Sequence, residues 1–223
     1  MTEVAEEQVA AKPEGLRERK KRQTRQQISD IATGLFLERG FDAVTIAEIA
    51  QAADVSVNTV YNYFPAKEDL FFDRMEGMSG GLARIVRGRD VGESAARALL
   101  RELRSELVAV SPKLGLIDGY DRFMRVIEGA HTLKARLWYL QQEIHDTTVR
   151  TLREEVAADA DDPLPVLVGG QLVWVQGTVI TYIGRELMAG RKAVEVSRDA
   201  LAMLEEIEDL LSEKVLNYAV RTG

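Results

Sequence analysis

The chain has 223 residues, a formal net charge of −7 and no cysteine. This length allows one large or two small cores, while the lack of cysteine excludes disulfides, thiolate metal sites and cysteine nucleophiles. The negative charge argues against nucleic-acid binding over the whole surface but leaves room for a local basic patch, and the absence of long runs with alternating hydrophobicity predicts an all-α fold.

Residues 1–15 are acidic and punctuated by proline and glycine, so we predict a disordered tail. They contain no apolar signal-peptide core, and we expect a cytoplasmic protein. A basic run follows, in which only Glu18 opposes the cations Arg17, Arg19, Lys20, Lys21, Arg22 and Arg25. Alone, such a run is typical of a solvated helix start. Its position just upstream of the motif at residues 45–64 indicates an arm that contacts DNA phosphates, because clustered cations release counterions on binding.

The next segment is predicted to be a helix, because apolar residues recur there on one face. These residues are Ile28, Ile31, Ala32, Leu35 and Phe36. The helix is expected to end at Arg39, where Gly40 suits a left-handed C-cap.

Residues 45–64 are predicted to form two short helices joined by a tight turn. Thr45 and Glu48 have the spacing of a capping box at the start of the first helix. Asp54-Val55 makes the turn, and Ser56 caps the second helix. The pattern is that of a helix-turn-helix, in which the second helix enters the major groove of DNA.

The second helix has a narrow apolar stripe, since Val60 and Phe64 are four residues apart and point inward. The opposite side carries amides, hydroxyls and an aromatic ring, from Asn58, Thr59, Tyr61 and Asn62. Side chains of these types read or hold DNA in a groove.

Pro65 ends this helix, and Lys67 begins the next one against the helix dipole. Lys67 is therefore either a snorkelling surface lysine or, with free backbone N–H groups, a phosphate clamp. The helix is expected to run through Phe72, Met75 and Met78 towards Arg89, and Gly80-Gly81 bends or interrupts it.

A joint pattern runs through residues 24–71. It consists of Ile31-Ala-x-x-Leu-Phe36, Gly40-Phe41, Thr45-Ile-Ala-Glu-Ile-Ala50, Val55-Ser56, Thr59-Val-Tyr61, Tyr63-Phe64 and Lys67-Glu-Asp-Leu70. This pattern resembles the DNA-binding domain of the tetracycline-repressor (TetR) family of bacterial transcription regulators. The resemblance covers less than a quarter of the chain, and the remainder matches the family only in length and helical character.

The resemblance implies a homodimer in which residues 16–66 form three DNA-binding helices and residues 67–223 form a ligand-binding and dimerisation domain of about six helices. By position, Thr45 would contact phosphate. Base edges would be faced by Val57, Asn58 and Asn62, and the DNA backbone would be held by Thr59, Tyr61, Tyr63 and Lys67.

Two positions depart from the family pattern. Asn58 stands where members often have glycine, alanine or proline, so an extra amide is available, for instance to read adenine. Ala66 replaces the common serine cap before Lys67, which we expect to weaken that helix start by about 1 kcal/mol.

The rest of the chain contains five further predicted helices, separated by breaks at Ser111-Pro112, Gly129-Ala130, the acidic loop 159–165 and Gly190. They are expected at about residues 93–110, 118–127, 132–158, 164–189 and 197–218.

Residues 164–184 carry no charge, which is long enough to raise the possibility of a membrane span. Their glutamines, threonines and glycines make the hydrophobicity modest, so a helix buried in a soluble assembly is favoured and no membrane contact is expected. Glycines recur there every seven residues, which indicates close approach of another helix. In the TetR family the last two long helices commonly form the dimer interface; the alternative is packing within one chain. The dimer residues expected here are Gly170, Gly177, Thr181, Gly184, Leu201, Leu204 and Leu211.

A ligand pocket is the weakest of these expectations. Pockets are mostly apolar with a few converging polar groups, and large or polar residues occur on the helices that should be central. They are Tyr120, Phe123, Trp138, Gln142, Gln171, Trp174, Val175, Gln176, Thr178 and Tyr182. Taken singly, each of these residues is more typical of a core or an interface than of a ligand contact. As a set they indicate a pocket for a mostly apolar small molecule. No cluster of cations in the sequence indicates a strongly anionic ligand.

No enzymatic function is expected. Glu128-x-x-His131 superficially matches half of a di-iron motif, but a second copy is missing, and His145 lies apart from it. Nucleophile-elbow, P-loop and dinucleotide-binding motifs are also missing. We therefore expect no metal and no cofactor.

The hypothesis from the sequence is a homodimeric, DNA-binding regulator, a repressor that a small, mostly apolar molecule releases from a pseudo-palindromic operator. Two alternatives remain open at this stage. One is a helical module whose basic arm binds a membrane or an acidic protein, and the other is a helical di-iron-type enzyme.

Overall fold

The computed structural model describes residues 15–73, 81–117 and 119–223, and these residues form helices but no strands. The predicted all-α fold is confirmed. The expectations for the tail at residues 1–15 and for Met75, Met78 and Gly80 lie wholly or largely outside the described residues.

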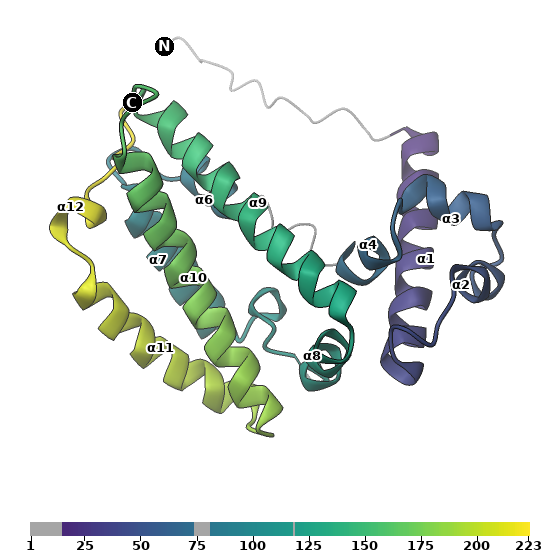
Figure 1. The fold of residues 1–223 in the computed structure, drawn as a ribbon. Coiled ribbons are helices and arrows are strands. Elements are labelled where there is room, and N and C mark those ends of the chain that lie inside the picture. Colours follow the sequence, from purple (N-terminus) through teal and green to yellow (C-terminus); the bar gives the residue numbers. More distant parts are fainter. Residues whose placement is uncertain (1–14, 74–80, 118) are drawn as a thin grey trace, which may run out of the picture.

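Four helices form one end of the molecule, which we call the head (Figure 1). They are α1 (Leu16–Arg39), α2 (Ile46–Ala52), α3 (Val57–Tyr63) and α4 (Lys67–Phe72). The remaining helices form the body: α6 (Gly81–Arg87), α7 (Ala95–Val108), α8 (Tyr120–Gly129), α9 (His131–Glu155), α10 (Leu164–Met188), α11 (Ala193–Leu210) and α12 (Glu213–Leu216), with a 3-10 turn at Pro112–Leu114.

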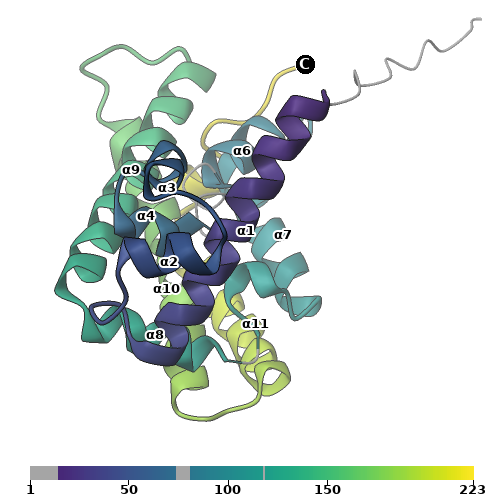
Figure 2. The ribbon, with the colours of Figure 1, turned by 90° about the vertical axis from the view of Figure 1, so that its right-hand side faces the viewer.

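The head has its own core, which gathers the apolar faces of α1 to α4 around Phe36, Phe64 and Phe71. Residues of the body complete this core, because Ile127 and Leu133, at the corner between α8 and α9, are buried in it. Figure 1 and Figure 2 both place α8 beside the C-terminal end of α1, and the two helices are in contact. Head and body are therefore joined by shared apolar packing.

The core of the body lies around α10, which contacts α7, α8, α9 and α11. Helix α10 is long and apolar enough to cross a membrane by length and composition, yet only 33% of its most apolar window is buried inside the protein. The rest of its surface needs another explanation, because a wide apolar face is rarely left to water.

Glycines allow close contacts on α10, but of the sevenfold series only Gly184 makes one, and the tightest is at Gly169. A Cβ at Gly169 would lie 2.9 Å from Val149 Cγ2 of α9, and one at Gly184 would lie 3.2 Å from the ring of Tyr120. A Cβ at Gly177 would have no atom within 4 Å in the part of the chain that the structure describes. The close approach to α9 therefore uses Gly169, and only Gly177 leaves open space.

Two expectations about helix ends are wrong. The helix predicted at residues 197–218 is two helices, because Leu211 and Ser212 are extended and the Ser212 hydroxyl caps α12. Gly40 has a positive φ of 84° but a ψ of 156°, so the residue is not a left-handed cap. Only glycine adopts such a conformation readily.

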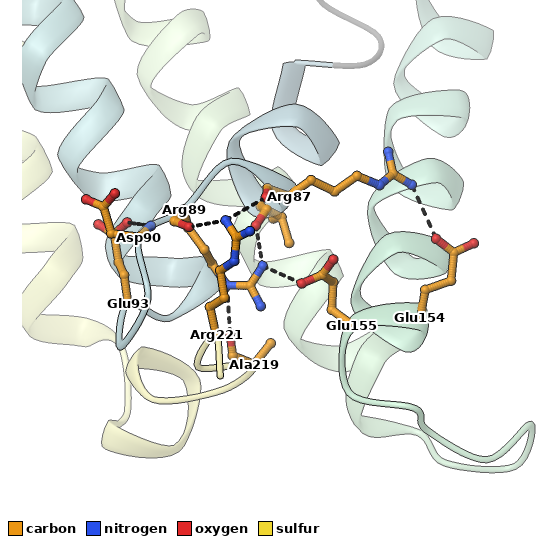
Figure 3. Close-up of polar contacts among 9 residues, drawn as sticks. Arg87, Arg89, Asp90, Glu93, Glu154, Glu155, Ala219 and Arg221 are labelled. Atoms are coloured by element: carbon orange, nitrogen blue, oxygen red, sulfur yellow. Dashed lines mark hydrogen bonds and ion pairs between the residues drawn. The ribbon is translucent and has the colours of Figure 1, made fainter. Parts of the chain in front are cut away.

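The C-terminal tail is tied to the loop between α6 and α7. Arg221 exchanges backbone hydrogen bonds of 2.9 Å with Gly92 and Glu93. The side chain of Arg89, 1% exposed, donates to the carbonyls of Val86 and Ala219 and to Glu155 Oε2 at 2.7 Å (Figure 3). One buried guanidinium thus connects α6, the end of α9 and the tail.

Candidate nucleic-acid interface

Helix α3 presents one face to the core and the other to solvent. Val60 and Phe64 are fully buried, as predicted from their spacing. The turn before α3 contains Asp54 with φ 55°, and the Ser56 hydroxyl accepts a hydrogen bond of 3.0 Å from Thr59 N. The cap and the two buried side chains fix the rotation of α3 about its axis.

The outer face of α3 carries the side chains expected to reach DNA. Asn58 and Asn62 are exposed, and Val57 and Tyr61 are exposed to nearly half of their surface. Thr59 and Tyr63 are half-buried at the edge of this face, and the Thr59 hydroxyl is 2.8 Å from that of Ser56. The arrangement offers two amides and a phenol on one short helix, which suits a DNA groove.

The start of α2 is a capping box, as predicted. Glu48 N donates to the Thr45 hydroxyl at 3.2 Å, and Glu48 Oε2 accepts from Thr45 N and from the Thr45 hydroxyl, both at 2.8 Å. Arg39 donates to the other oxygen of Glu48 at 2.7 Å. The hydrogen bond from Arg39, followed by those from Thr45, lowers the pKa of Glu48 from 4.5 to about 2.

We expect Glu48→Gln to change the pH dependence of stability. Because the pKa of Glu48 is lower in the folded state, its stabilising effect is complete above the unfolded pKa and is lost as the pH falls towards the folded value. The difference in melting temperature between wild type and Glu48→Gln should therefore be present at neutral pH and narrow below about pH 5. Thermal unfolding followed by circular dichroism at several pH values measures it. Glu143→Gln, on the surface of α9, is the control and should show no such narrowing.

Lys67 faces inward more than either interpretation of the sequence suggested. Its ammonium donates to the carbonyl of Phe41 at 2.6 Å and lies 4.3 Å from the centre of the Phe41 ring. Burial lowers the pKa of this ammonium. Asp69 accepts a hydrogen bond from Ala66 N at 3.1 Å, which partly replaces the missing serine cap. A DNA phosphate would have to share Lys67 with Phe41, using the remaining N–H groups.

The basic run forms the first turns of α1. Arg17, Lys20, Lys21 and Arg22 are exposed there. Arg25 differs from them, because its guanidinium pairs with Asp73 at 2.7 Å and lies 4.9 Å from the Phe64 ring centre. Arg25 thus packs against the ring of Phe64, at the end of the recognition helix α3.

The residues predicted to line a ligand pocket do not share one site. Phe123 stacks on Phe71 of the head with ring centres 4.4 Å apart, and Tyr120 lies next to Phe123 at 6.2 Å. Val175 is fully buried in the body core, while Gln176, Thr178 and Tyr182 are half-buried on α10. Phe123 therefore links α8 to the head through aromatic packing, and Tyr120 packs on Phe123 within α8.

The other four predicted pocket residues lie on the outside. Trp138 and Trp174 are 56% and 53% exposed, and Gln142 and Gln171 are exposed on the same two helices, α9 and α10. Side chains this exposed cannot line an enclosed pocket within one protomer. We call Trp138, Leu167, Gln171 and Trp174 the outer face of α9 and α10.

The residues predicted for dimerisation divide into two groups. Gly184 and Leu204 are buried inside the protomer, the first against Tyr120 and the second in the body core, so neither can face a second subunit. Thr181 is exposed. Gly170, Gly177, Leu201 and Leu211 are half-buried.

An all-α fold with a capped helix-turn-helix, an outward recognition helix and a basic first helix defines a helix-turn-helix DNA-binding protein. The family model for "Bacterial regulatory proteins, tetR family" matches residues 28–73, the segment from the middle of α1 to the end of α4. Residues 28–73 thus match the DNA-binding domain of this family, and the chain is a DNA-binding transcription regulator.

Similar proteins agree with this assignment. The transcriptional regulator TcmR of Streptomyces glaucescens is 28% identical over 153 residues, which cover 66% of this chain and 67% of TcmR. The repressor KstR2 of Mycobacterium tuberculosis is 31% identical over 77 residues, 34% of this chain and 38% of KstR2. The crystal structure of NalD, a repressor from Pseudomonas aeruginosa, shares the fold with a TM-score of 0.56 at 21% identity, over 86% of this chain and 98% of NalD.

These matches favour a DNA-binding regulator over the two alternatives from the sequence, since the family consists of transcription regulators rather than enzymes. In the described part of the chain, no three histidine or acidic side chains gather in a way that could hold a metal ion.

Proposed function

We propose that the protein is a cytoplasmic, homodimeric repressor that binds an inverted-repeat operator and is released from it by a small molecule. Residues 16–66 would hold DNA, and residues 67–223 would hold the effector and the second subunit. The observation that carries the proposal is the outer face of α3, where Asn58, Tyr61 and Asn62 are exposed while Val60 and Phe64 fix the helix from behind.

The contacts to DNA divide by chemistry in this proposal. Val57, Asn58 and Asn62 reach base edges and confer specificity. The backbone is held by Thr45, Thr59, Tyr61, Tyr63 and Lys67, together with the cations Arg17, Lys20, Lys21 and Arg22 of the first turns of α1.

Dimerisation is supported by the outer face of α9 and α10. Trp138 of α9 and Leu167 and Trp174 of α10 are more than half exposed there, and α10 is largely unburied within one protomer. Half-sites read by two copies of α3 require the two-fold arrangement of a dimer. We therefore place Gly170, Gly177, Thr181, Leu201 and Leu211 at or near the contact between subunits.

Release by an effector requires a ligand to favour one orientation of the heads over another. The stacking of Phe123 of α8 on Phe71 of α4, and the ion pair of 3.0 Å between Arg136 of α9 and Asp69 of α4, connect body and head. Shifts of α8 or α9 would thereby change the separation of the recognition helices in the dimer.

The test is binding to duplexes from the gene's own upstream region at several salt concentrations, measured by fluorescence anisotropy. We expect preference for an inverted repeat and a linear fall of log affinity with log salt. Equal affinity for the inverted repeat and for random duplex would contradict sequence-specific binding.

We expect Asn58→Gly to change the preferred base at one position of each half-site, with a change in discrimination of about 1–3 kcal/mol. The salt dependence should stay close to that of the wild type, because no phosphate contact is removed. Lys21→Ala is the matched control, since it should weaken binding to all sequences alike and lower the salt slope by about 1. An unchanged operator preference in Asn58→Gly would show that Asn58 does not read bases.

A further inference from the structure

A groove with a volume of about 560 Å³ lies between head and body. One wall is the end of α1 and the turn that follows it, and the other is one face of α8. In Figure 2, α8 lies behind the C-terminal end of α1. The volume lies within the range of sites for small molecules.

The groove brings together three arginines that are far apart in the sequence. Arg39 comes from α1, and Arg122 and Arg125 come from successive turns of α8, three residues apart and therefore on one side of the helix. Among the described residues of the lining Asp42 is the single acidic one, and Glu48 and Asp121 pair with Arg39 and Arg125 from outside it.

The three guanidiniums are not equally available. Arg39 is held by Glu48 and Arg125 by Asp121. Arg122 is exposed, and its side chain has no hydrogen bond or ion pair with any described part of the chain. Arginine binds carboxylates through two parallel N–H donors, so Arg122 is positioned to take an anion from outside the protein.

The remaining lining is partly apolar. Leu37 and Phe41 contribute apolar surface from the head, and Val126 contributes it from α8. Cations together with apolar surface suit a molecule that has a charged end and an apolar body.

We propose that this groove binds a small organic carboxylate with an aromatic or acyl body. Arg122 binds the carboxylate, with Arg125 adjacent, and the apolar part lies against Leu37, Phe41 and Val126. The ligand is therefore an amphipathic anion, a class that the sequence did not indicate because the cations meet only in the fold.

The site is placed where binding affects the head. Lys67, the first residue of α4, donates to the carbonyl of Phe41, and the Phe41 ring lies 5.0 Å from Phe36 in the head core. A ligand between the walls sets the distance between this turn and α8. Its effect on operator affinity rests on the proposed function, whereas its binding does not.

The test uses isothermal titration calorimetry without DNA, with 2-naphthoate as probe and the uncharged 2-naphthamide as its matched analogue. We expect saturable binding of 2-naphthoate and at least about 10-fold weaker binding of the amide, because the charge-assisted hydrogen bonds are lost. Arg122→Ala should weaken 2-naphthoate binding by at least about 10-fold. Arg150→Ala, on the surface of α9, should leave it unchanged.

A second variant fills the groove. Gly129 lines it, and a Cβ added there meets no atom of the described residues within 4 Å, so Gly129→Phe is expected to fold and to abolish binding. Gly34→Phe on α1, where a Cβ likewise meets none of the described atoms within 4 Å, is its control. Circular dichroism verifies the fold of each variant. Absence of saturable 2-naphthoate binding to the wild type, or binding that Arg122→Ala leaves unchanged, overturns the proposal.

DNA binding is measured separately with the same variants. Loss of 2-naphthoate binding in Arg122→Ala with unchanged operator affinity supports the site as a ligand site. Loss of operator affinity in Arg122→Ala, with no 2-naphthoate binding to the wild type, assigns the arginine to DNA phosphates and overturns the proposal. Failure of the wild type to bind any operator contradicts the proposed function and leaves the calorimetric result standing.

Discussion

Replacing Arg89 by methionine should lower the free energy of unfolding by about 3 kcal/mol. The side chain is 1% exposed and donates to the carbonyls of Val86 and Ala219 and to Glu155. Methionine keeps much of the apolar stem but removes every donor, leaving the two carbonyls and the carboxylate without this partner. Glu155 is partly exposed, so water can hydrate its carboxylate after the substitution. We therefore expect a loss of stability at the lower end of the range for breaking a buried ion pair.

The matched control is Arg87→Met, two residues away. Arg87 pairs with Glu154 at 3.3 Å, and both side chains are about half exposed (Figure 3). Such a pair contributes at most about 1 kcal/mol. Urea unfolding at one fixed protein concentration measures both variants, since dimerisation would couple stability to concentration. Equal losses in the two variants would mean that Arg89 does not hold the tail, α6 and α9 together.

The helix-turn-helix could be predicted from the sequence because its determinants are local. Thr45 with Glu48 and Ser56 with Thr59 make their caps within three residues, and the burial of Val60 and Phe64 follows from their spacing alone. The break at Ser212 is equally local. The Ser212 hydroxyl caps α12, so the serine before Glu213 indicates the start of a new helix. The prediction of one continuous helix followed the apolar stripe across this position instead.

The candidate sites outside the motif depend on contacts between distant residues, which periodicity does not reveal. The carbonyl that accepts the hydrogen bond from the Lys67 ammonium belongs to Phe41, 26 positions earlier in the sequence. Arg25 pairs with Asp73, 48 positions later. Arg39 and Arg122 meet only because α8 packs on α1. The same limit explains the pocket residues: hydrophobicity placed Trp138 and Trp174 on central helices, but the packing of α9 on α10 decided that they face outward.

Introducing a charge at Trp174 should convert the proposed dimer to monomers. Trp174 is 53% exposed within one protomer, on the same face as Leu167 and near the open side of Gly177. Tryptophan is among the residues that dominate the energetics of interfaces, and an unpaired carboxylate buried between subunits carries a desolvation cost of several kcal/mol. Trp174→Glu should therefore shift the monomer–dimer equilibrium by a factor of at least about 100, equivalent to 2.7 kcal/mol.

Loss of the dimer should also lower the affinity for the operator, because a monomer binds one half-site and loses the linked second contact. Sedimentation velocity and operator binding are measured on the same samples. Val108→Glu, at an apolar position on α7 that is 68% exposed, is the control and should remain dimeric. Since Trp174 is half exposed, circular dichroism should show an intact fold in the variant. A Trp174→Glu protein that remains dimeric and binds the operator at wild-type affinity would place the subunit contact elsewhere, and the exposed surface of α10 would then require a different partner.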